Sequence, residues 1–121
     1  MPEPIAIISA KRTPIGGLLG SLVSIPAPKL GAIAINAARE SAGLKFHQID
    51  EIIMGCVLSA GIGQAPARQA ALYAGLDNAT SCTTVNKVCG SGMSAVMMAC
   101  NAIHSGQSKA IIAGGMENMS R

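Results

Sequence analysis

The sequence predicts an α/β fold with a mainly parallel sheet and helices on both of its faces. Short apolar or β-branched runs alternate with longer stretches in which small apolar residues recur at helical spacing, and glycines or prolines separate them. Half of the residues are hydrophobic while only 2% are aromatic, so the core is expected to consist mainly of aliphatic side chains and methionine. A chain of 121 residues fits one domain or part of a larger one.

Four short segments are expected to form the strands of this sheet. The run IAIISA at residues 5–10 is an apolar segment behind Pro4, which is typical of a buried strand. Isoleucines and a valine mark a second strand at residues 51–57. The β-branched run CTTV at residues 82–85 and the apolar run KAIIA at residues 109–113 complete the set.

Three longer stretches predict helices. Residues 28–42 and 67–74 each begin beside a proline, which the first turn of a helix tolerates, and each is followed by a glycine that ends the helix. The third helix, residues 89–104, is apolar on all sides, which is typical of a helix buried inside a larger protein. One of its faces carries Met93, Val96, Met97, Cys100 and Ile103.

The charge content indicates a surface that other protein covers. Charged residues make up 12% of the chain, about half of the ~25% usual in a soluble domain. We therefore expect a partner subunit, or a remainder of the same polypeptide, to cover part of the surface. The net charge of +3 comes from scattered lysines and arginines, and aromatic residues are nearly absent, so no nucleic-acid partner is expected.

Composition also limits the cellular setting and the cofactors. No apolar run approaches the ~20 residues of a membrane span, and the amino terminus lacks the pattern of a secretory signal. The four cysteines, Cys56, Cys82, Cys89 and Cys100, form no C-x-x-C pair and lie far in sequence from the histidines, so no metal site is expected. We expect a cytoplasmic protein with free thiols and no membrane association.

Cys89 is the candidate nucleophile. It stands in NKVCGSGM, where a strand ends, the chain turns and a helix is expected to begin at the cysteine. The free N–H groups and the dipole of a helix start favour the thiolate, and the flanking glycines leave the sulfur open to a substrate. The backbone N–H of Cys89 is also placed to donate to an oxyanion as an acyl group is attacked. The other three cysteines are interpreted as small hydrophobic residues.

The base that a thiolate nucleophile usually needs is not evident in the sequence. His104 lies fifteen residues beyond Cys89 on the same expected helix, roughly 22 Å along its axis, and fits a favourable charge at the helix end. His47 fits a surface connection. The base is therefore expected outside these residues. Glu117 and Asn118 follow a strand and two glycines, and a loop role is favoured over a site role.

Four sequence blocks resemble the thiolases, and they occur in the order of that family. They are AKRTPIGG at residues 10–17, GQAPARQAA at residues 63–71, VNKVCGSGM at residues 85–93, which is similar to the active-cysteine signature, and AGGMENMS at residues 113–120. The cysteine block is similar to that of biosynthetic acetoacetyl-CoA thiolases. By this resemblance, residues 1–121 form a partial amino-terminal thiolase domain.

The resemblance implies an acetyl-CoA C-acetyltransferase. Two acetyl-CoA molecules would condense to acetoacetyl-CoA and free CoA, or the reverse thiolysis would occur. Cys89 would hold the acetyl group as a thioester, and a second cysteine would remove a proton from the next acetyl-CoA. Coenzyme A thioesters would be the substrates, with no metal or bound redox cofactor, and the residues that bind coenzyme A stay unknown.

The resemblance also implies that functional parts lie elsewhere. The activating histidine of the family lies in a Gly-His-Pro stretch and the acid–base cysteine near a Cys-x-Gly-Gly stretch, and neither stretch occurs here. The chain would be an incomplete amino-terminal half-domain of a five-layer αβαβα subunit, inactive by itself. Thiolases usually dimerise through the strand before the nucleophile, here around Ser81 to Asn86, so a homo-oligomer, dimer or tetramer, is implied.

Two other interpretations stay open. The chain could be a non-catalytic interaction module that uses its apolar surfaces to bind a partner. It could also be a portion of a ketoacyl-synthase-type condensing enzyme, which shares the cysteine-at-helix arrangement but fits the flanking blocks less well.

Overall fold

A parallel sheet of three strands organises the computed structural model, which describes residues 3–121. The strands are β1 (Glu51–Gly55), β2 (Ser81–Val85) and β3 (Ile111–Gly115), and their order in the sheet is β2-β1-β3. Glu51 stands opposite Ser81 on one side and Ile111 on the other, so all three strands begin at the same edge. The nucleophile candidate follows β2 and therefore lies at the opposite, carboxyl edge.

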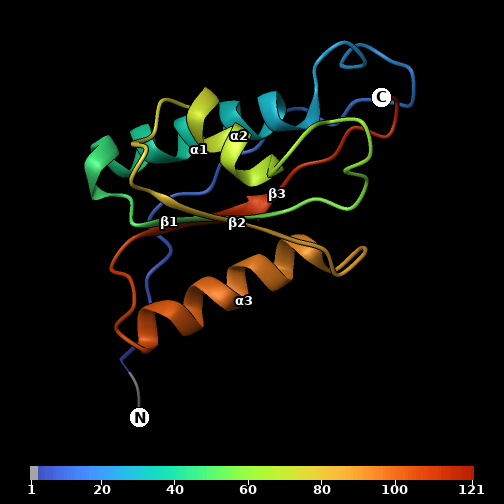
Figure 1. Cartoon of the computed structure of the whole chain (residues 1–121). Coiled ribbons are helices and arrows are strands. Elements are labelled where there is room, and N and C mark those ends of the chain that lie inside the picture. The colour runs from blue at the N-terminus through green and yellow to red at the C-terminus, as the bar shows by residue number, and fades with distance from the viewer. Residues whose placement is uncertain (1–2) are drawn as a thin grey trace.

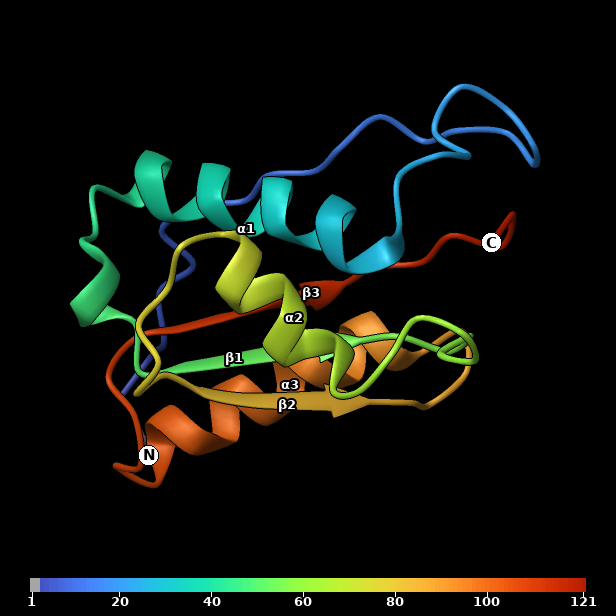
Figure 2. The same ribbon diagram turned by 45° about the horizontal axis from the view of Figure 1, so that its top comes forward.

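Helices cover both faces of this sheet. The helices α1 (Ala27–Ala42) and α2 (Pro66–Tyr73) pack on one face, and α3 (Ser91–His104) packs on the other (Figure 1). The turned view shows the same three layers, with α3 behind the sheet (Figure 2). A short 3-10 helix, η1 (Phe46–Gln48), leads into β1. The predicted α/β class, the parallel sheet and the helices on both faces are confirmed. Within residues 3–121, no helix combines the length and the apolar character that crossing a bilayer demands.

The main core lies between the sheet and the pair α1 and α2. Small residues allow the two helices to approach closely: a Cβ added to Gly31 of α1 would stand 3.4 Å from the Cβ of Ala70 in α2. The same added Cβ would stand 2.6 Å from the sulfur of Met116, which follows β3. The glycines predicted to end both helices do so. Gly43 follows α1 and Gly75 lies just beyond α2, each with a left-handed backbone (φ 72° and 91°). The buried side chains of this core include Ile35, Ile52, Met54, Cys56, Ala67, Ala70 and Ala71.

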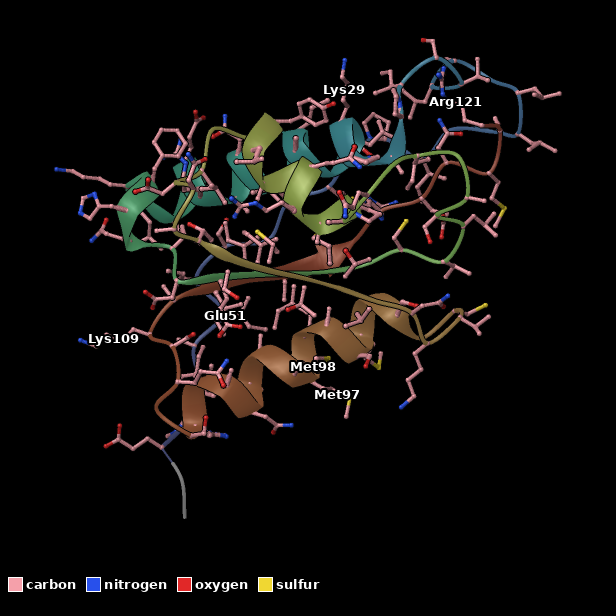
Figure 3. The ribbon with its side chains drawn as sticks, in the orientation of Figure 1. Lys29, Glu51, Met97, Met98, Lys109 and Arg121 are labelled. Carbon is pink, nitrogen blue, oxygen red and sulfur yellow. The ribbon has the colours of Figure 1, made fainter. Side chains whose placement is uncertain are left out.

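Helix α3 packs against the sheet with one side only. Only its small residues face the sheet, where Ala95 and Ala99 meet Ile53. Met93 and Met97 are 73% and 60% exposed, and Met97 projects away from the sheet (Figure 3). A three-stranded sheet covers only one side of a helix, so burial of α3 on all sides inside a larger protein stays a prediction.

The prediction of a strand at residues 5–10 is wrong. These residues follow an extended path outside the sheet, and Ile7 and Ile8 are 80% and 62% exposed. An apolar run forms a strand only where a neighbouring strand pairs with its backbone, and no strand in residues 3–121 does so here. The sheet has three strands where the sequence predicted four.

Side chains at both edges of the sheet decide where two strands begin and end. The Asp50 carboxylate accepts hydrogen bonds from the N–H groups of Lys109 (2.8 Å) and Ala110 (3.1 Å). These bonds lower the pKa of Asp50. Because the amides of Lys109 and Ala110 bond to this carboxylate, β3 begins at Ile111 instead of at residue 109. At the other edge β1 ends at Gly55, two residues before the predicted end. The Cys56 N–H still donates to the Val85 carbonyl (3.0 Å), but the Val57 N–H donates to the Glu117 carboxylate (2.9 Å).

Candidate active site

Cys89 lies in the turn that joins β2 to α3, and it is exposed. The helix begins at Ser91 with Gly90 as its N-cap, so the prediction that the helix begins at the cysteine is wrong by two residues. The thiol therefore sits just ahead of the positive end of α3, with its flanking glycines on the helix side.

Hydrogen bonds within the turn hold its backbone in one conformation. The side-chain oxygen of Asn86 accepts from the Val88 N–H (3.0 Å). The carbonyl of Lys87 accepts from the Gly90 N–H (3.0 Å), and the carbonyl of Val88 accepts from the Ser91 N–H (3.1 Å). These bonds constrain the backbone both before and after Cys89.

Val88, the residue before the nucleophile candidate, has a left-handed backbone. Its φ is 49°, which a β-branched residue rarely adopts. Such a conformation costs about 1–3 kcal/mol and persists only where surrounding bonds enforce it. The arrangement resembles the strained strand-to-helix turns that expose nucleophiles in other acyl-transfer folds.

Ser91 is a second element of the turn, and the sequence analysis missed it. Its side chain is buried, with 4% of the residue exposed. The hydroxyl accepts from the Lys87 N–H (2.7 Å) and donates to the Val88 carbonyl (2.6 Å). A serine in the first turn of a helix commonly bonds nearby backbone, which is the one signal that could have indicated this role.

Two glycines of the sheet allow α3 to approach it at this point. A Cβ added to Gly55 would stand 2.6 Å from the carbonyl carbon of Ser91, and one added to Gly115 would stand 3.5 Å from Cα of Gly92. The start of α3 thus lies directly on the ends of β1 and β3. The glycines place the Cys89 turn on the carboxyl edge of the sheet.

One backbone amide of the turn, that of Cys89, has no hydrogen-bond partner among the described residues. In residues 3–121 no hydrogen bond engages the Cys89 N–H, while the amides of Val88, Gly90 and Ser91 all have partners. An exposed thiol and an unengaged amide of the same residue are the two groups needed to attack a carbonyl and to bind the resulting oxyanion.

Two of the other cysteines, Cys56 and Cys82, are less suited to attack. Burial, assisted by the nearby Glu117 carboxylate, raises the pKa of the Cys56 thiol to about 11, and only 1% of that residue is exposed. Burial also raises the pKa of Cys82, against the effect of Arg68. Cys100 lies on α3 with its sulfur 3.8 Å from Nδ1 of His104. Cys56 and Cys82 are therefore protonated at neutral pH.

The structure brings neither histidine to Cys89. His104 occupies the last turn of α3, as expected, and its Nε2 lies 3.0 Å from the carbonyl oxygen of Glu3. His47 is exposed in η1, which precedes β1 and so lies toward the amino edge of the sheet. In the part of the chain that is described, the base for Cys89 is not among the histidines.

Glu117 and Asn118 hold loops, in agreement with the expected role. The Glu117 carboxylate accepts from the N–H groups of Val57 (2.9 Å) and Leu58 (3.0 Å), and its Oε1 lies 3.8 Å from the Cys56 sulfur. The Asn118 amide donates to three backbone carbonyls, those of Leu22, Val23 and Ile25. Both side chains fix the loops at the carboxyl edge.

Two hollows lie away from the turn. One of about 510 Å³ opens at the amino edge of the sheet, beside Glu51 and Lys109 (Figure 3). Another of about 400 Å³ lies beside α2, between Tyr73 and Arg121. Cys89 lines neither of these two hollows. Residues 3–121 also contain no group of three histidine, cysteine, aspartate or glutamate side chains that could hold a metal ion.

A parallel α/β sheet with a constrained cysteine turn at its carboxyl edge is an arrangement that enzymes of acyl transfer use to expose a nucleophile. Residues 5–121 match the family model for the thiolase amino-terminal domain. The chain belongs to the thiolase family and corresponds to this amino-terminal domain.

Relatives of known name extend this assignment. The chain is 57% identical over 116 residues to an acetyl-CoA acetyltransferase of Cupriavidus necator, covering 96% of this chain and 30% of the relative. It is 55% identical over 119 residues to acetyl-CoA acetyltransferase 2 of Arabidopsis thaliana, covering 98% and 30%. A mitochondrial acetyl-CoA acetyltransferase of Rattus norvegicus is 57% identical over 116 residues, with 96% and 27% covered. The chain thus spans about 30% of the length of these relatives.

A solved structure shows the same fold. The crystal structure of a thiolase from Ascaris suum in complex with coenzyme A superposes with a TM-score of 0.93 at 40% sequence identity. The match covers 95% of this chain and 30% of that one. The three-layer arrangement described above is therefore that of a thiolase.

Proposed function

We propose that this chain is the amino-terminal part of an acetyl-CoA C-acetyltransferase and that Cys89 carries the acetyl group. The observation that carries the proposal is the exposed thiol on a constrained turn before α3, beside an unengaged amide of the same residue. The names of the relatives supply the substrate class, since the three relatives reported above are acetyl-CoA acetyltransferases.

The proposed step transfers an acetyl group from coenzyme A to the protein. The Cys89 thiolate attacks the thioester carbonyl carbon, a carbon–sulfur bond forms, and the carbonyl electron pair moves onto oxygen. The Cys89 N–H donates to this oxyanion. When the oxyanion collapses, the bond to the coenzyme A sulfur breaks, and the released thiolate takes a proton from a general acid. The products are acetyl-Cys89 and free coenzyme A.

The remaining chemistry is assigned to residues outside this chain. A histidine that activates Cys89 and a second cysteine that removes a proton from the next acetyl-CoA are what the thiolase resemblance implies. His47 and His104 lie away from the turn. Burial raises the pKa of the Cys56 and Cys82 thiols, so both stay protonated at neutral pH. We therefore expect residues 1–121 alone, a partial thiolase domain, to show negligible turnover.

Two kinds of partner follow from the proposal. The Ascaris suum relative was solved with coenzyme A, which supports coenzyme A thioesters as ligands of the complete subunit. Strand β2 is an edge of the described sheet, since it pairs with β1 alone, and its side chains are exposed or half-buried. A second copy could pair along this edge, from Ser81 to Asn86, to form a homo-oligomer. The cytoplasmic location also stays a prediction, because several relatives are named as mitochondrial.

One observation favours the alternative of an interaction module. The apolar side chains of α3 that face away from the sheet form an exposed surface made of Met93, Val96, Met97 and Met98. This surface suits contact with further protein, and a non-catalytic fragment would use it in the same way. Acetylation of Cys89 distinguishes the two, because an interaction module needs no reactive thiol.

The test is to measure covalent acetylation of the complete subunit that carries this chain. The subunit is mixed with acetyl-CoA, and its intact mass and digested peptides are measured. We expect one acetyl group on the peptide with Cys89, and none in a Cys89→Ser variant. A Cys100→Ser variant is the matched control and should be acetylated like the parent. Acetylation that persists after Cys89→Ser, or that is absent from the parent, would overturn the proposal.

A further inference from the structure

We propose that Ser91 is a positioning residue for acyl transfer: its hydroxyl orients and polarises the Val88–Cys89 peptide, whose N–H binds the oxyanion. This inference rests on the proposed function, because it concerns the same cysteine. It assigns a role to a side chain that touches neither the sulfur nor, in the proposed step, the substrate.

The geometry follows from the peptide group itself. The carbonyl of Val88 and the N–H of Cys89 belong to one planar trans peptide, so they point in opposite directions and move together. The Ser91 hydroxyl (2.6 Å) and the Ser91 N–H (3.1 Å) both donate to the Val88 carbonyl oxygen. Holding the carbonyl toward α3 therefore holds the Cys89 N–H away from it, on the outer side of the turn.

The hydroxyl is itself part of a chain of hydrogen bonds. The Lys87 N–H donates to Ser91 Oγ (2.7 Å), Ser91 Oγ–H donates to the Val88 carbonyl, and that carbonyl shares its peptide with the Cys89 N–H. Successive bonds of this kind polarise one another. A peptide whose carbonyl accepts strong hydrogen bonds is a stronger N–H donor. This series of hydrogen bonds therefore strengthens the hydrogen bond that the Cys89 N–H donates to an oxyanion.

The site of Ser91 is rigid enough to serve this purpose. The residue is 4% exposed and lies against Gly55, whose position leaves no space for a Cβ. The strained backbone of Val88 (φ 49°) would relax without bonds that oppose it. The Ser91 hydroxyl thus holds one peptide orientation, and it does so at the residue that precedes the nucleophile.

Two reactions of the same sulfur separate this role from a purely structural one. Acetylation by acetyl-CoA passes through an oxyanion and needs the Cys89 N–H. Alkylation by iodoacetamide displaces iodide from a carbon atom and builds no oxyanion, so it depends only on a reachable thiolate. A residue that serves the oxyanion donor should affect the first rate and spare the second.

The experiment compares variants of the complete subunit that carries this chain. Ser91→Ala and Ser91→Gly both remove the hydroxyl and are smaller than serine, so at least one is expected to fold. Ser91→Thr keeps the hydroxyl. Ser94→Ala, one turn along the same helix, is the matched control, since the Ser94 hydroxyl forms no hydrogen bond within residues 3–121. Acetylation by acetyl-CoA and alkylation by iodoacetamide are timed by mass at Cys89.

We expect the hydroxyl-free variants to be acetylated about 10-fold more slowly, less than the ~10²–10³ lost with a whole oxyanion donor. Their alkylation should stay within about twofold of the parent, because the thiolate is unchanged. Ser91→Thr should be acetylated faster than both, and Ser94→Ala should match the parent. Equal slowing of both reactions, or no slowing of acetylation, would overturn the role of Ser91. A parent that is alkylated but never acetylated at Cys89 would instead overturn the proposed function, and this inference with it.

Discussion

Gly55, the last residue of β1, lies directly against Ser91, the first residue of α3. A Cβ built on Gly55 would stand 2.6 Å from the carbonyl carbon of Ser91 and 2.7 Å from its Cβ. The central strand and the nucleophile turn therefore meet at a contact that only glycine allows. Stability and the geometry of Cys89 are coupled at this contact, since any movement of Ser91 moves the turn that it holds.

Gly55→Ala should destabilise the protein and displace the turn. The added methyl group meets backbone atoms, which cannot move aside as a flexible side chain can, and overpacking of this kind costs about 1–3 kcal/mol or more. A fall in the urea midpoint and slower acetylation of Cys89 are the expected results. Gly17→Ala is the control, because a Cβ there meets no described atom within 4 Å. Equal stability of the two variants would contradict the contact.

Val88→Gly should leave stability unchanged or raise it. Glycine adopts a φ of 49° without strain. This relief offsets the cost of about 1 kcal/mol that comes from the greater conformational freedom of glycine in the unfolded chain. Little buried surface is lost, because Val88 is 65% exposed. The comparison is Val96→Gly in the middle of α3, which should lose about 0.3–0.5 kcal/mol from helix propensity and also the packing of a partly buried side chain. Thermal melting of both variants measures this, and an equal loss would show that Val88 is not strained.

Glu117→Gln should loosen the loop that follows β1. The carboxylate accepts from the amides of Val57 and Leu58 with two different oxygens, whereas glutamine offers one oxygen, so one amide is left unpaired. Because the Val57 bond is only partly buried and the Leu58 bond is exposed, the expected cost is about 0.5–1.5 kcal/mol, the net contribution of one hydrogen bond. Hydrogen exchange of these two amides and the urea midpoint provide the measurement. Glu40→Gln, at an exposed carboxylate near Arg39, is the control and should change neither.

Stability should fall as the pH rises from 9 toward 11, in part through Cys56. Its pKa in the folded protein is about 11, above the value of 9.0 for an unperturbed thiol, so the folded state holds the proton more tightly. The contribution is complete below pH 9 and is lost as the pH passes through 11, by up to about 3 kcal/mol. Urea unfolding at pH 8 and pH 10.5 should show a smaller pH effect in Cys56→Ala. An identical effect in that variant would contradict the assignment.

The elements that depend on nearby residues were predictable from the sequence. Prolines and glycines bracket α1 and α2, and the alternation of apolar runs with helical stretches predicts the α/β class. Cys89 was singled out because its type, its glycine neighbours and its place between a strand and a helix are all local features. The thiolase resemblance rests on the same local blocks.

Errors arose where a residue depends on distant ones. Residues 5–10 have the composition of a strand, but no strand in residues 3–121 pairs with them. The start of β3 depends on the Asp50 carboxylate, about sixty residues away. The end of β1 depends in the same way on the Glu117 carboxylate. Such bonds leave no periodic signal in the chain.

By itself, the sequence determined the order of the three helices and the three strands, apart from the extra strand predicted at residues 5–10, and it singled out Cys89 as the candidate nucleophile. Propensity, periodicity and turn residues act over a few positions, and this is why they could be read from the sequence. Only the tertiary structure decided how that cysteine is presented. The contact of Gly55 with Ser91 joins residues from different elements, and the left-handed Val88 persists through bonds that the folded turn supplies. The physical reason is that hydrogen bonds and steric contacts form between groups that are close in space, whatever their separation along the chain.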